Sequence, residues 1–474
     1  MKYFIKSIIL YLWMITTQTF AQNVGIGTTT PQQKLHVNGA IKIGEAGSAT
    51  PVAGTIQWNN TKREFEGFNG TQWISLNNSM TGWGDTQTFI TENDGFDSFL
   101  NGNNGLTGTS LGHSLATWNN HFVSGSPFDH DGNDYLHTGS MRHYYKPDGA
   151  PWRFSVKFSS LRLGESAYFG KSVASNGKFL VSSTLGLNSI TVYTINGYSI
   201  LHPEEIIHND GAAPGSFGES VSIDSNTIVV GAPEKMWQGQ DKAGRAFLYR
   251  HNGNVWVQTA ALNAPAAESN GLFGTSCAIQ GMYLAIGAPA NNLNSQINSG
   301  KVFVYRRNGP LWGLIATLEA PLESSAKKFG VSVAINGNKL AIGAAVTMTN
   351  AHINGTVNIY TLEGNNVTHE TTLSDNKPNT LFGHSLAFKD NLLVIGAPAT
   401  KNKSYHNSGL VHVYVSKNNQ WQKEAILVPS VLQSYSSFGY AVGITNDDII
   451  VGAPGTDLPN RPANGKIYIF KKPL

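Results

Sequence analysis

Short stretches in which large apolar residues alternate with small or polar ones recur along most of the chain. One of them is Phe329-Gly-Val-Ser-Val-Ala-Ile335, and it is followed by Asn338–Ala345, Gly355–Tyr360 and a piece from Val367 to Leu373. β-Branched and aromatic residues at period two, bounded by Gly, Asn and Pro, are typical of β-strands. Sustained helical periodicity is absent, so the pattern predicts an all-β fold built from groups of four short strands.

The first strand of each group belongs to an internal repeat. Phe-Gly, a variable residue and then Ser or Ala recur about every 55 residues, which is the spacing of a repeat architecture. The first copy is weaker and has leucine in place of phenylalanine. The copies begin at Leu111, Phe169, Phe217, Phe273, Phe329, Phe382 and Phe438. Seven groups of four strands predict a seven-bladed β-propeller of four-stranded blades.

Large and small residues alternate along the first strand of each copy, and residues two apart share one face of a strand. The innermost strand is therefore expected to have a bulky face and a small face, as dense packing between wedge-shaped neighbours requires. The single cysteine, Cys277, takes a position that holds Val or Leu in other copies. We expect it to be a small buried hydrophobe.

The last copy, which begins at Phe438, lacks a fourth strand of its own after Gly465–Phe470. The stretch Gly82–Thr91 resembles the Trp-led fourth strands of other copies. An open terminal blade would expose strand edges. Residues 82–91 are therefore predicted to complete the last blade, so that the propeller spans residues 82–474.

Two short signatures frame each unit. Phe-Gly opens it, and in four units Gly-Ala-Pro closes the second strand, at residues 231–233, 287–289, 396–398 and 452–454. Over residues 82–474 the chain resembles FG-GAP repeat proteins, whose repeats form the seven-bladed head of integrin α subunits and of many bacterial exported proteins. Integrin-like copies carry a calcium loop between strands one and two. In this chain the segments between strands one and two carry too few suitably spaced oxygen ligands to bind calcium, so the family's calcium sites are not expected.

The segment before the propeller has two parts. Residues 1–21 have a positively charged start, an apolar stretch and a small-x-small cleavage site at Thr19–Ala21, which predicts a secretory signal peptide. Residues 22–81 are rich in short β-type pieces and resemble stem segments of bacterial surface and tail-fibre-like proteins. Their few large apolar groups make a marginal core alone. We expect a stem that forms a homo-oligomer, such as a trimer, or docks on the propeller.

Composition excludes several functional classes. Of 474 residues, 13% are charged and 51 are glycine, as in a folded, turn-rich chain. The net charge of +3 argues against a dedicated groove for nucleic acid. No apolar run is long enough to predict a transmembrane segment.

Loops after the second strand and loops before each Phe-Gly should open on one side of the ring, here called the loop face, where function tends to lie. The residue after Phe-Gly varies between copies and should surround the axial opening. In chain order these axial residues are His113, Lys171, Glu219, Thr275, Val331, His384 and Tyr440. The candidate ligand-binding residues on the loops are Phe128, Tyr135, Glu234, Trp237, Asn291, Tyr405, His406 and Asp457.

One loop gathers side chains that could bind a metal ion. Asp129, Asp131, Asp134 and His137 lie within nine residues and could hold calcium or another divalent metal. The glycine of this loop is not at the sixth position, where an EF-hand loop requires it. The alternative is a solvated polar loop held by Asx-turns.

These features favour an exported, non-catalytic binding or adhesion protein that presents the loop face to an extracellular glycan or a surface protein. The alternative is a secreted propeller enzyme, a glycosidase or lyase acting on polysaccharide, since fold does not fix function. A glycosidase would need two converging carboxylates. The loop face offers only the scattered acids Asp129, Asp131, Glu234 and Asp457.

Overall fold

The chain divides into two compact units, residues 1–80 and 81–474. The computed structural model describes residues 24–26, 35–37, 55–59, 64–68, 73–75, 88–90, 108–130, 137–162, 166–209, 216–290, 299–320, 328–345, 354–457 and 464–472. The expected signal peptide lies outside these residues, and no helix within them is long and apolar enough to cross a membrane. The first unit contains a parallel pair, β1 (Val24–Ile26) and β2 (Leu35–Val37), and a three-stranded antiparallel sheet, β3 (Ile56–Asn59), β4 (Glu64–Phe68) and β5 (Trp73–Ser75).

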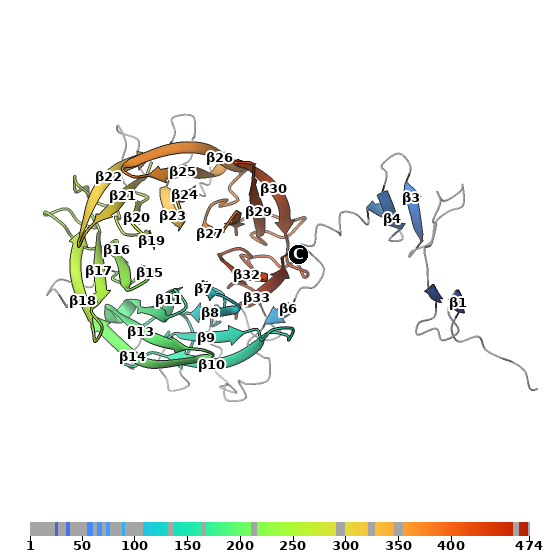
Figure 1. The fold of residues 1–474 in the computed structure, drawn as a ribbon, viewed down its shortest axis with the longest axis horizontal. Coiled ribbons are helices and arrows are strands. Elements are labelled where there is room, and N and C mark those ends of the chain that lie inside the picture. Colours follow the sequence, from blue (N-terminus) through green and yellow to red (C-terminus); the bar gives the residue numbers. More distant parts are fainter. Residues whose placement is uncertain are drawn as a thin grey trace, which may run out of the picture. The chain divides into compact units, whose positions relative to one another are not determined.

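The second unit is a ring of seven four-stranded antiparallel sheets, which confirms the predicted seven-bladed propeller (Figure 1). Strand one of each blade lies nearest the axis and strand four lies at the rim. Blades one to three are β7 (Ser114–Trp118), β8 (His121–Ser126), β9 (Ser140–Tyr145) and β10 (Arg153–Ser159); β11 (Phe169–Ser175), β12 (Phe179–Thr184), β13 (Ser189–Asn196) and β14 (Ser199–Ile207); and β15 (Ser220–Asp224), β16 (Thr227–Ala232), β17 (Arg245–His251) and β18 (Trp256–Leu262).

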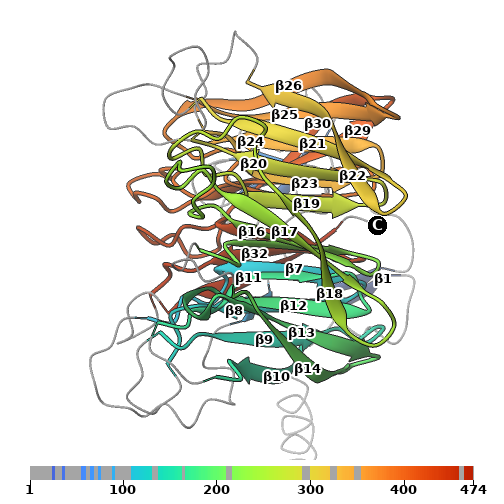
Figure 2. The same cartoon turned by 90° about the vertical axis from the view of Figure 1, so that its left-hand side faces the viewer.

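The remaining blades follow the same order, and their strands run between the two faces of the ring (Figure 2). They are β19 (Ser276–Gln280), β20 (Tyr283–Ala288), β21 (Lys301–Asn308) and β22 (Leu311–Glu319); β23 (Phe329–Asn336), β24 (Lys339–Ala344), β25 (Asn354–Glu363) and β26 (Asn366–Pro378); β27 (Ser385–Lys389), β28 (Leu392–Ala397), β29 (Leu410–Lys417) and β30 (Gln420–Leu427); and β31 (Ala441–Ile444), β32 (Asp448–Ala453), β33 (Lys466–Lys471) and β6 (Thr88–Ile90). A short 3₁₀ helix, η2 (Leu185–Leu187), lies between β12 and β13.

Blade seven is assembled from distant parts of the chain. Its fourth strand is β6, which lies within residues 82–91 and pairs antiparallel with β33 through residues 467–469. Beside it, the Leu111 N–H of the first copy donates to the Asn464 carbonyl at 2.9 Å. Blade one is therefore joined to blade seven by backbone contacts, and the ring is closed.

Strand four of blade five is longer than its sequence pattern indicates. The apolar alternation ends at Leu373, but β26 continues to Pro378, which pairs with Asn354 after a bulge. In this extension only Ser374, opposite Thr356, and Pro378 have register partners. The extension has no apolar alternation, so the side-chain pattern alone placed the end of this strand too early.

The hydrophobic core lies between neighbouring blades. In the layer between blades two and three, Phe217, Val221 and Ile223 pack with Val181 and Ile190 of the preceding blade. The large residues of strand one therefore fill the space between two sheets, as the alternation of bulk predicts.

Cys277 belongs to the next of these layers. It is buried with a free thiol and packs in one cluster with Phe273, Ile286 and Leu248. Burial raises the pKa of the thiol to about 12. The prediction of a small buried hydrophobe is confirmed, because such a thiol stays protonated and inert.

The Phe-Gly and Gly-Ala-Pro signatures meet across the gap between blades. Gly287 of blade four lies against the carbonyl of Gly330 in blade five, and a Cβ on Gly287 would overlap that oxygen. Ser276 Oγ donates to the same carbonyl at 2.7 Å. The same approach is made by Gly125, Gly231, Gly343, Gly396 and Gly452. The two signatures therefore recur together because each provides half of one backbone contact.

Candidate functional site on the loop face

The same β-turn holds the variable residue after Phe-Gly in all seven copies. The N–H of His113, for example, donates to the Ser110 carbonyl at 3.2 Å, and Ser110 has a φ of 59°. The residue before Leu or Phe has a positive φ in every copy, although this costs a non-glycine residue about 1 kcal/mol. The buried residue that follows it holds the turn in place. Seven variable side chains therefore begin from equivalent positions at the inner strand.

Five of the expected axial residues contact an axial neighbour. The Tyr440 ring lies 4.9 Å from the His113 ring and 4.7 Å from the His384 ring. The Tyr440 hydroxyl is 3.4 Å from His113 Nε2, and Lys171 Nζ is 3.5 Å from Glu219 Oε1. These five half-buried residues come from blades six, seven, one, two and three and are called the axial cluster. The contacts agree with the expectation that this position faces the axis.

Two imidazoles of the axial cluster are neutral at pH 7. Burial, followed by the charges of Lys171 and His384, lowers the pKa of His113 to about 3. Burial, assisted by Lys171, lowers the pKa of His384 to about 4. A neutral imidazole donates one hydrogen bond and accepts another. The cluster therefore combines adaptable neutral groups with one ion pair.

Phe128 connects the axial cluster to the outer loops. Its ring lies 6.1 Å from His113, 5.5 Å from His137 and 5.8 Å from Tyr168. His137 also stacks on Tyr168 at 5.8 Å. Together with Tyr440, these half-buried residues form a continuous series of rings, which we call the aromatic band.

Asp129 follows Phe128 but is engaged in buried ion pairs. Its Oδ2 lies 3.1 Å from Arg142 Nη2 and 2.9 Å from Lys157 Nζ, and it accepts a hydrogen bond from Ser140 Oγ at 2.5 Å. Burial by itself would raise the pKa of this carboxyl, but the two cations and the hydrogen bond lower it below its ordinary value. The carboxylate therefore neutralises Arg142 and Lys157. The sequence suggested instead that it would be available to bind a metal ion.

The rest of the expected metal loop is only partly described. Asp131 and Asp134 lie outside the described residues. The His137 N–H donates to His130 Nδ1 at 3.3 Å, and the His137 ring belongs to the aromatic band. Within the part of the chain that the structure describes, no three His, Cys, Asp or Glu side chains form a metal-binding group.

Two hairpins with matching backbone geometry carry further expected residues. Trp237 exchanges backbone hydrogen bonds with Gln240 at 3.1 and 2.9 Å, and Asn402 does so with Tyr405 at 3.1 and 3.0 Å. The Arg245 guanidinium carbon lies 4.4 Å above the Trp237 ring, which holds the indole in place. Tyr405 is 39% exposed. The two hairpins therefore present aromatic side chains from blades three and six.

The other expected ligand-binding residues are placed as follows. Glu234 is exposed and pairs with Lys242 at 3.1 Å. His406 is exposed and its N–H donates to Ser434 Oγ at 3.2 Å. Asp457 is exposed and its N–H donates to Gln433 Oε1 at 3.1 Å. Tyr135 and Asn291 lie outside the described residues.

Buried imidazoles elsewhere in the ring predict a loss of stability in acid. Burial, followed by His121, lowers the pKa of His143 to about 3, and burial, followed by Lys423 and Lys377, lowers that of His412 to about 4. Histidine in the unfolded chain takes up a proton near pH 6.5. The unfolded state therefore binds protons more tightly, and each such group lowers the free energy of unfolding by up to about 1.4 kcal/mol per pH unit below pH 6.5.

Thermal unfolding at pH 7, 5.5 and 4.5 would measure this effect, and we expect the melting temperature to fall at each step. His412→Phe is the matched variant, because Phe247 and Phe303 take the equivalent position in blades three and four. Its melting temperature should depend less on pH than that of the parent protein. Equal melting temperatures at pH 7 and 4.5 would contradict the prediction.

Comparison with known families is consistent with this architecture. Residues 203–249, 256–305 and 421–470 match the model of the FG-GAP repeat family. The protein is an FG-GAP repeat β-propeller protein. Each match in this FG-GAP repeat propeller runs from strand four of one blade to strand three of the next, so the sequence repeat is offset from the blade by one strand.

Solved structures similar to this FG-GAP repeat propeller include other β-propellers. The β-propeller domain of Swd1 from Myceliophteria thermophila has a TM-score of 0.49 at 10% identity, covering 81% of this chain and 99% of that one. The Kuenenia stuttgartiensis hydrazine synthase has a TM-score of 0.47 at 12% identity, covering 74% of this chain and 95% of that one. The WD40 domain of Toxoplasma gondii coronin has a TM-score of 0.46 at 9% identity, covering 77% of this chain and 83% of that one. Identity this low says nothing about shared function. No curated protein matches the sequence.

Proposed function

We propose that this FG-GAP repeat propeller is an exported, non-catalytic binding or adhesion protein whose loop face holds a glycan or a protein surface. The aromatic band is the observation that carries the proposal. Its rings offer apolar faces, and the neutral imidazole of His113 can hydrogen-bond to polar groups of a ligand. A rigid closed ring that positions such groups on turns and loops is a suitable binding scaffold.

The charged groups of the loop face favour binding over catalysis. A polysaccharide-cleaving enzyme needs two carboxylates that face each other across the substrate. Asp129 instead neutralises Arg142 and Lys157, and Glu234 is paired with Lys242. Binding without catalysis is therefore the function that the described loop-face residues support best.

The N-terminal unit has a separate role in this proposal. Residues 22–81 would act as a stem that carries the propeller and brings several copies together. Its short strands, β1 to β5, support a β-rich stem. Several propellers on one oligomeric stem would increase the strength of attachment to a surface that repeats its ligand.

Alanine variants on the loop face test the proposal. Phe128→Ala should weaken binding to a ligand identified on a glycan and surface-protein array by about tenfold or more, since it interrupts the aromatic band. Trp237→Ala, Tyr405→Ala and His406→Ala test the hairpins on the same array. Leu311→Ala is the matched control, because Leu311 is 72% exposed at a turn on the opposite face. If all four loop-face variants bind as the parent does, the site lies elsewhere and the proposal is wrong.

A further inference from the structure

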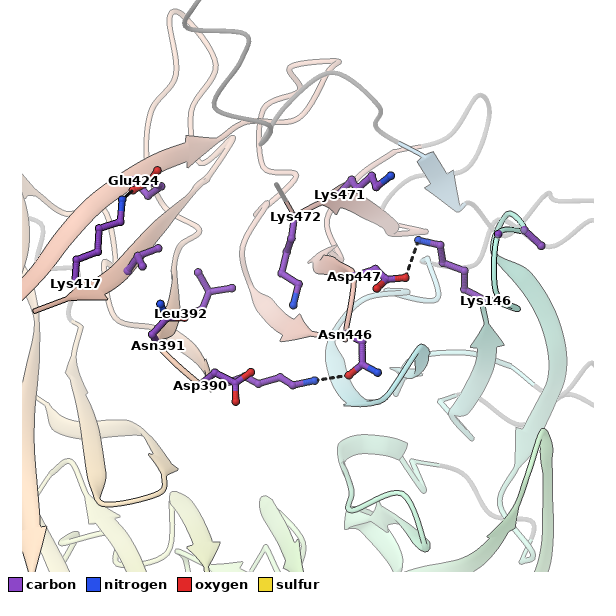
Figure 3. Close-up of a pocket in the computed structure, with 14 residues that line it drawn as sticks. Lys146, Asp390, Asn391, Leu392, Lys417, Glu424, Asn446, Asp447, Lys471 and Lys472 are labelled. Carbon is purple, nitrogen blue, oxygen red and sulfur yellow. Dashed lines mark hydrogen bonds and ion pairs between the residues drawn. The ribbon is translucent and has the colours of Figure 1, made fainter. Parts of the chain in front are cut away.

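A groove opens on the face opposite the loop face, where blades six, seven and one meet (Figure 3). Its volume is about 780 Å³. In six blades, a turn or short loop on this face joins strand three to strand four. In blade seven, β33 pairs instead with β6 from the start of the propeller. The groove lies beside the end of β33, between the corresponding turns of blades six and one, so the mode of ring closure creates it.

Positive charge predominates in the lining of this groove. Its charged residues are Lys146, Lys389, Lys417, Lys471, Lys472, Asp390, Glu424 and Asp447. Lys146 Nζ lies 2.7 Å from Asp448 Oδ2 and 3.6 Å from Asp447 Oδ2, and Lys417 Nζ lies 2.8 Å from Glu424 Oε2. Lys146 is therefore shared between two carboxylates, and Lys417 neutralises Glu424. Lys389, Lys471 and Lys472 have no carboxylate partner within salt-bridge distance among the described residues.

One turn directs two of the unpaired lysines into the groove. Lys389 Nζ donates to Asn446 Oδ1 at 2.8 Å, and Lys472 Nζ donates to the Thr445 carbonyl at 3.0 Å. Thr445 and Asn446 are neighbours in the β31–β32 turn. Burial, followed by the charge of Lys389, lowers the pKa of Lys472, although Asp390, Asp447 and Asp448 oppose the shift. The two ammonium groups therefore repel each other, and an anion bound between them would relieve this repulsion.

We propose that this groove binds an anionic oligosaccharide that carries sulfate or carboxylate groups. The volume lies within the range of about 300–1,000 Å³ that is usual for small-molecule sites, so it admits more than one tetrahedral anion. Lys389, Lys471 and Lys472 can contact separate charged groups. The exposed Asn391 and Asp390 offer partners for hydroxyl groups. None of the described residues that line the groove is aromatic, whereas sites for single-stranded nucleic acid rely on aromatic stacking.

Titration calorimetry with the full-length mature protein at low salt tests this inference. The probes are a sulfated tetrasaccharide, a uronic-acid tetrasaccharide, a neutral tetrasaccharide and a single-stranded oligonucleotide of matched charge. We expect at least one of the two acidic sugars to bind, and to bind at least tenfold more tightly than the neutral sugar and the oligonucleotide. Equal binding of the neutral sugar, or equal or tighter binding of the oligonucleotide, would overturn the proposed ligand class.

Paired variants locate the binding. The double variant Lys389→Gln/Lys472→Gln should weaken binding of the acidic sugar at least tenfold, whereas Lys389→Arg/Lys472→Arg should retain it. Lys401→Gln/Lys403→Gln is the control, since it removes two exposed lysines from the loop face. An equal loss in this control would show charge-driven binding without a site and would overturn the inference. The result is independent of the loop-face variants, because the two sites share no residue.

Discussion

Replacing Gly287 by valine is expected to lower the free energy of unfolding of the propeller by more than about 4 kcal/mol, or to prevent folding. A Cβ at this position would overlap the Gly330 carbonyl oxygen. Both atoms belong to strands fixed within their own blades, so neither can move without separating blades four and five. The displaced carbonyl would also lose the hydrogen bond from Ser276 Oγ. Denaturant unfolding followed by tryptophan fluorescence would measure the loss.

Gly313→Ala is the matched control for this experiment. Gly313 lies in the rim strand β22, and the nearest atom to its added Cβ would be the Arg306 carbonyl oxygen at 4.0 Å. This variant should change stability by no more than about 0.5 kcal/mol. If Gly287→Val were as stable as Gly313→Ala, the contact between Phe-Gly and Gly-Ala-Pro would not hold the blades together.

Deleting residues 82–91 is expected to cause a loss of similar size. The deletion removes β6 and leaves β33 as an open edge. Ile467, Tyr468 and Ile469, which are 0%, 1% and 2% exposed, are the residues of β33 that pair with β6. Exposing a large apolar side chain costs about 1.5–3 kcal/mol, and the unpaired edge would promote association between molecules. Melting temperature and light scattering would report both effects.

A variant that lacks residues 22–81 but keeps residues 82–91 distinguishes the effect of ring closure from the effect of shortening the chain. Its propeller should melt at the temperature of the full-length protein, since β6 is retained. Should the variant without residues 82–91 melt at that same temperature, β6 would make no contribution to the ring and another element would have to close it.

The sequence predicted the fold well because it repeats itself. Seven copies aligned on Phe-Gly show which positions are always large and which are always small, so the strands and their buried faces are defined several times over. The copies also identify the axial position, because the residue that stands between the Gly and the following Ser or Ala differs from copy to copy. Strand ends were harder to predict. The last residues of β26, Ser374–Pro378, have no apolar pattern and pair only at Ser374 and Pro378.

The candidate sites were predicted less completely, because they depend on contacts between different copies. Asp129 is held by Arg142 and Lys157, which lie on two other strands of blade one, and nothing in the loop sequence indicates those partners. The lysine groove is formed by side chains of three blades around a position where one connection is missing. Such a site has no repeated motif, so comparison of the copies could not find it.

The offset between the sequence repeat and the blade determines how a protein of this kind can change in size. A unit that runs from strand four of one blade to strand three of the next supplies one face of a packing layer, and the unit before it supplies most of the other face, such as Val181 and Ile190 opposite Phe217. Because the copies are equivalent at these positions, loss or duplication of a whole unit by recombination would again bring complementary faces together. The number of blades can therefore change in evolution by single steps, without an intermediate form that exposes a half-made interface.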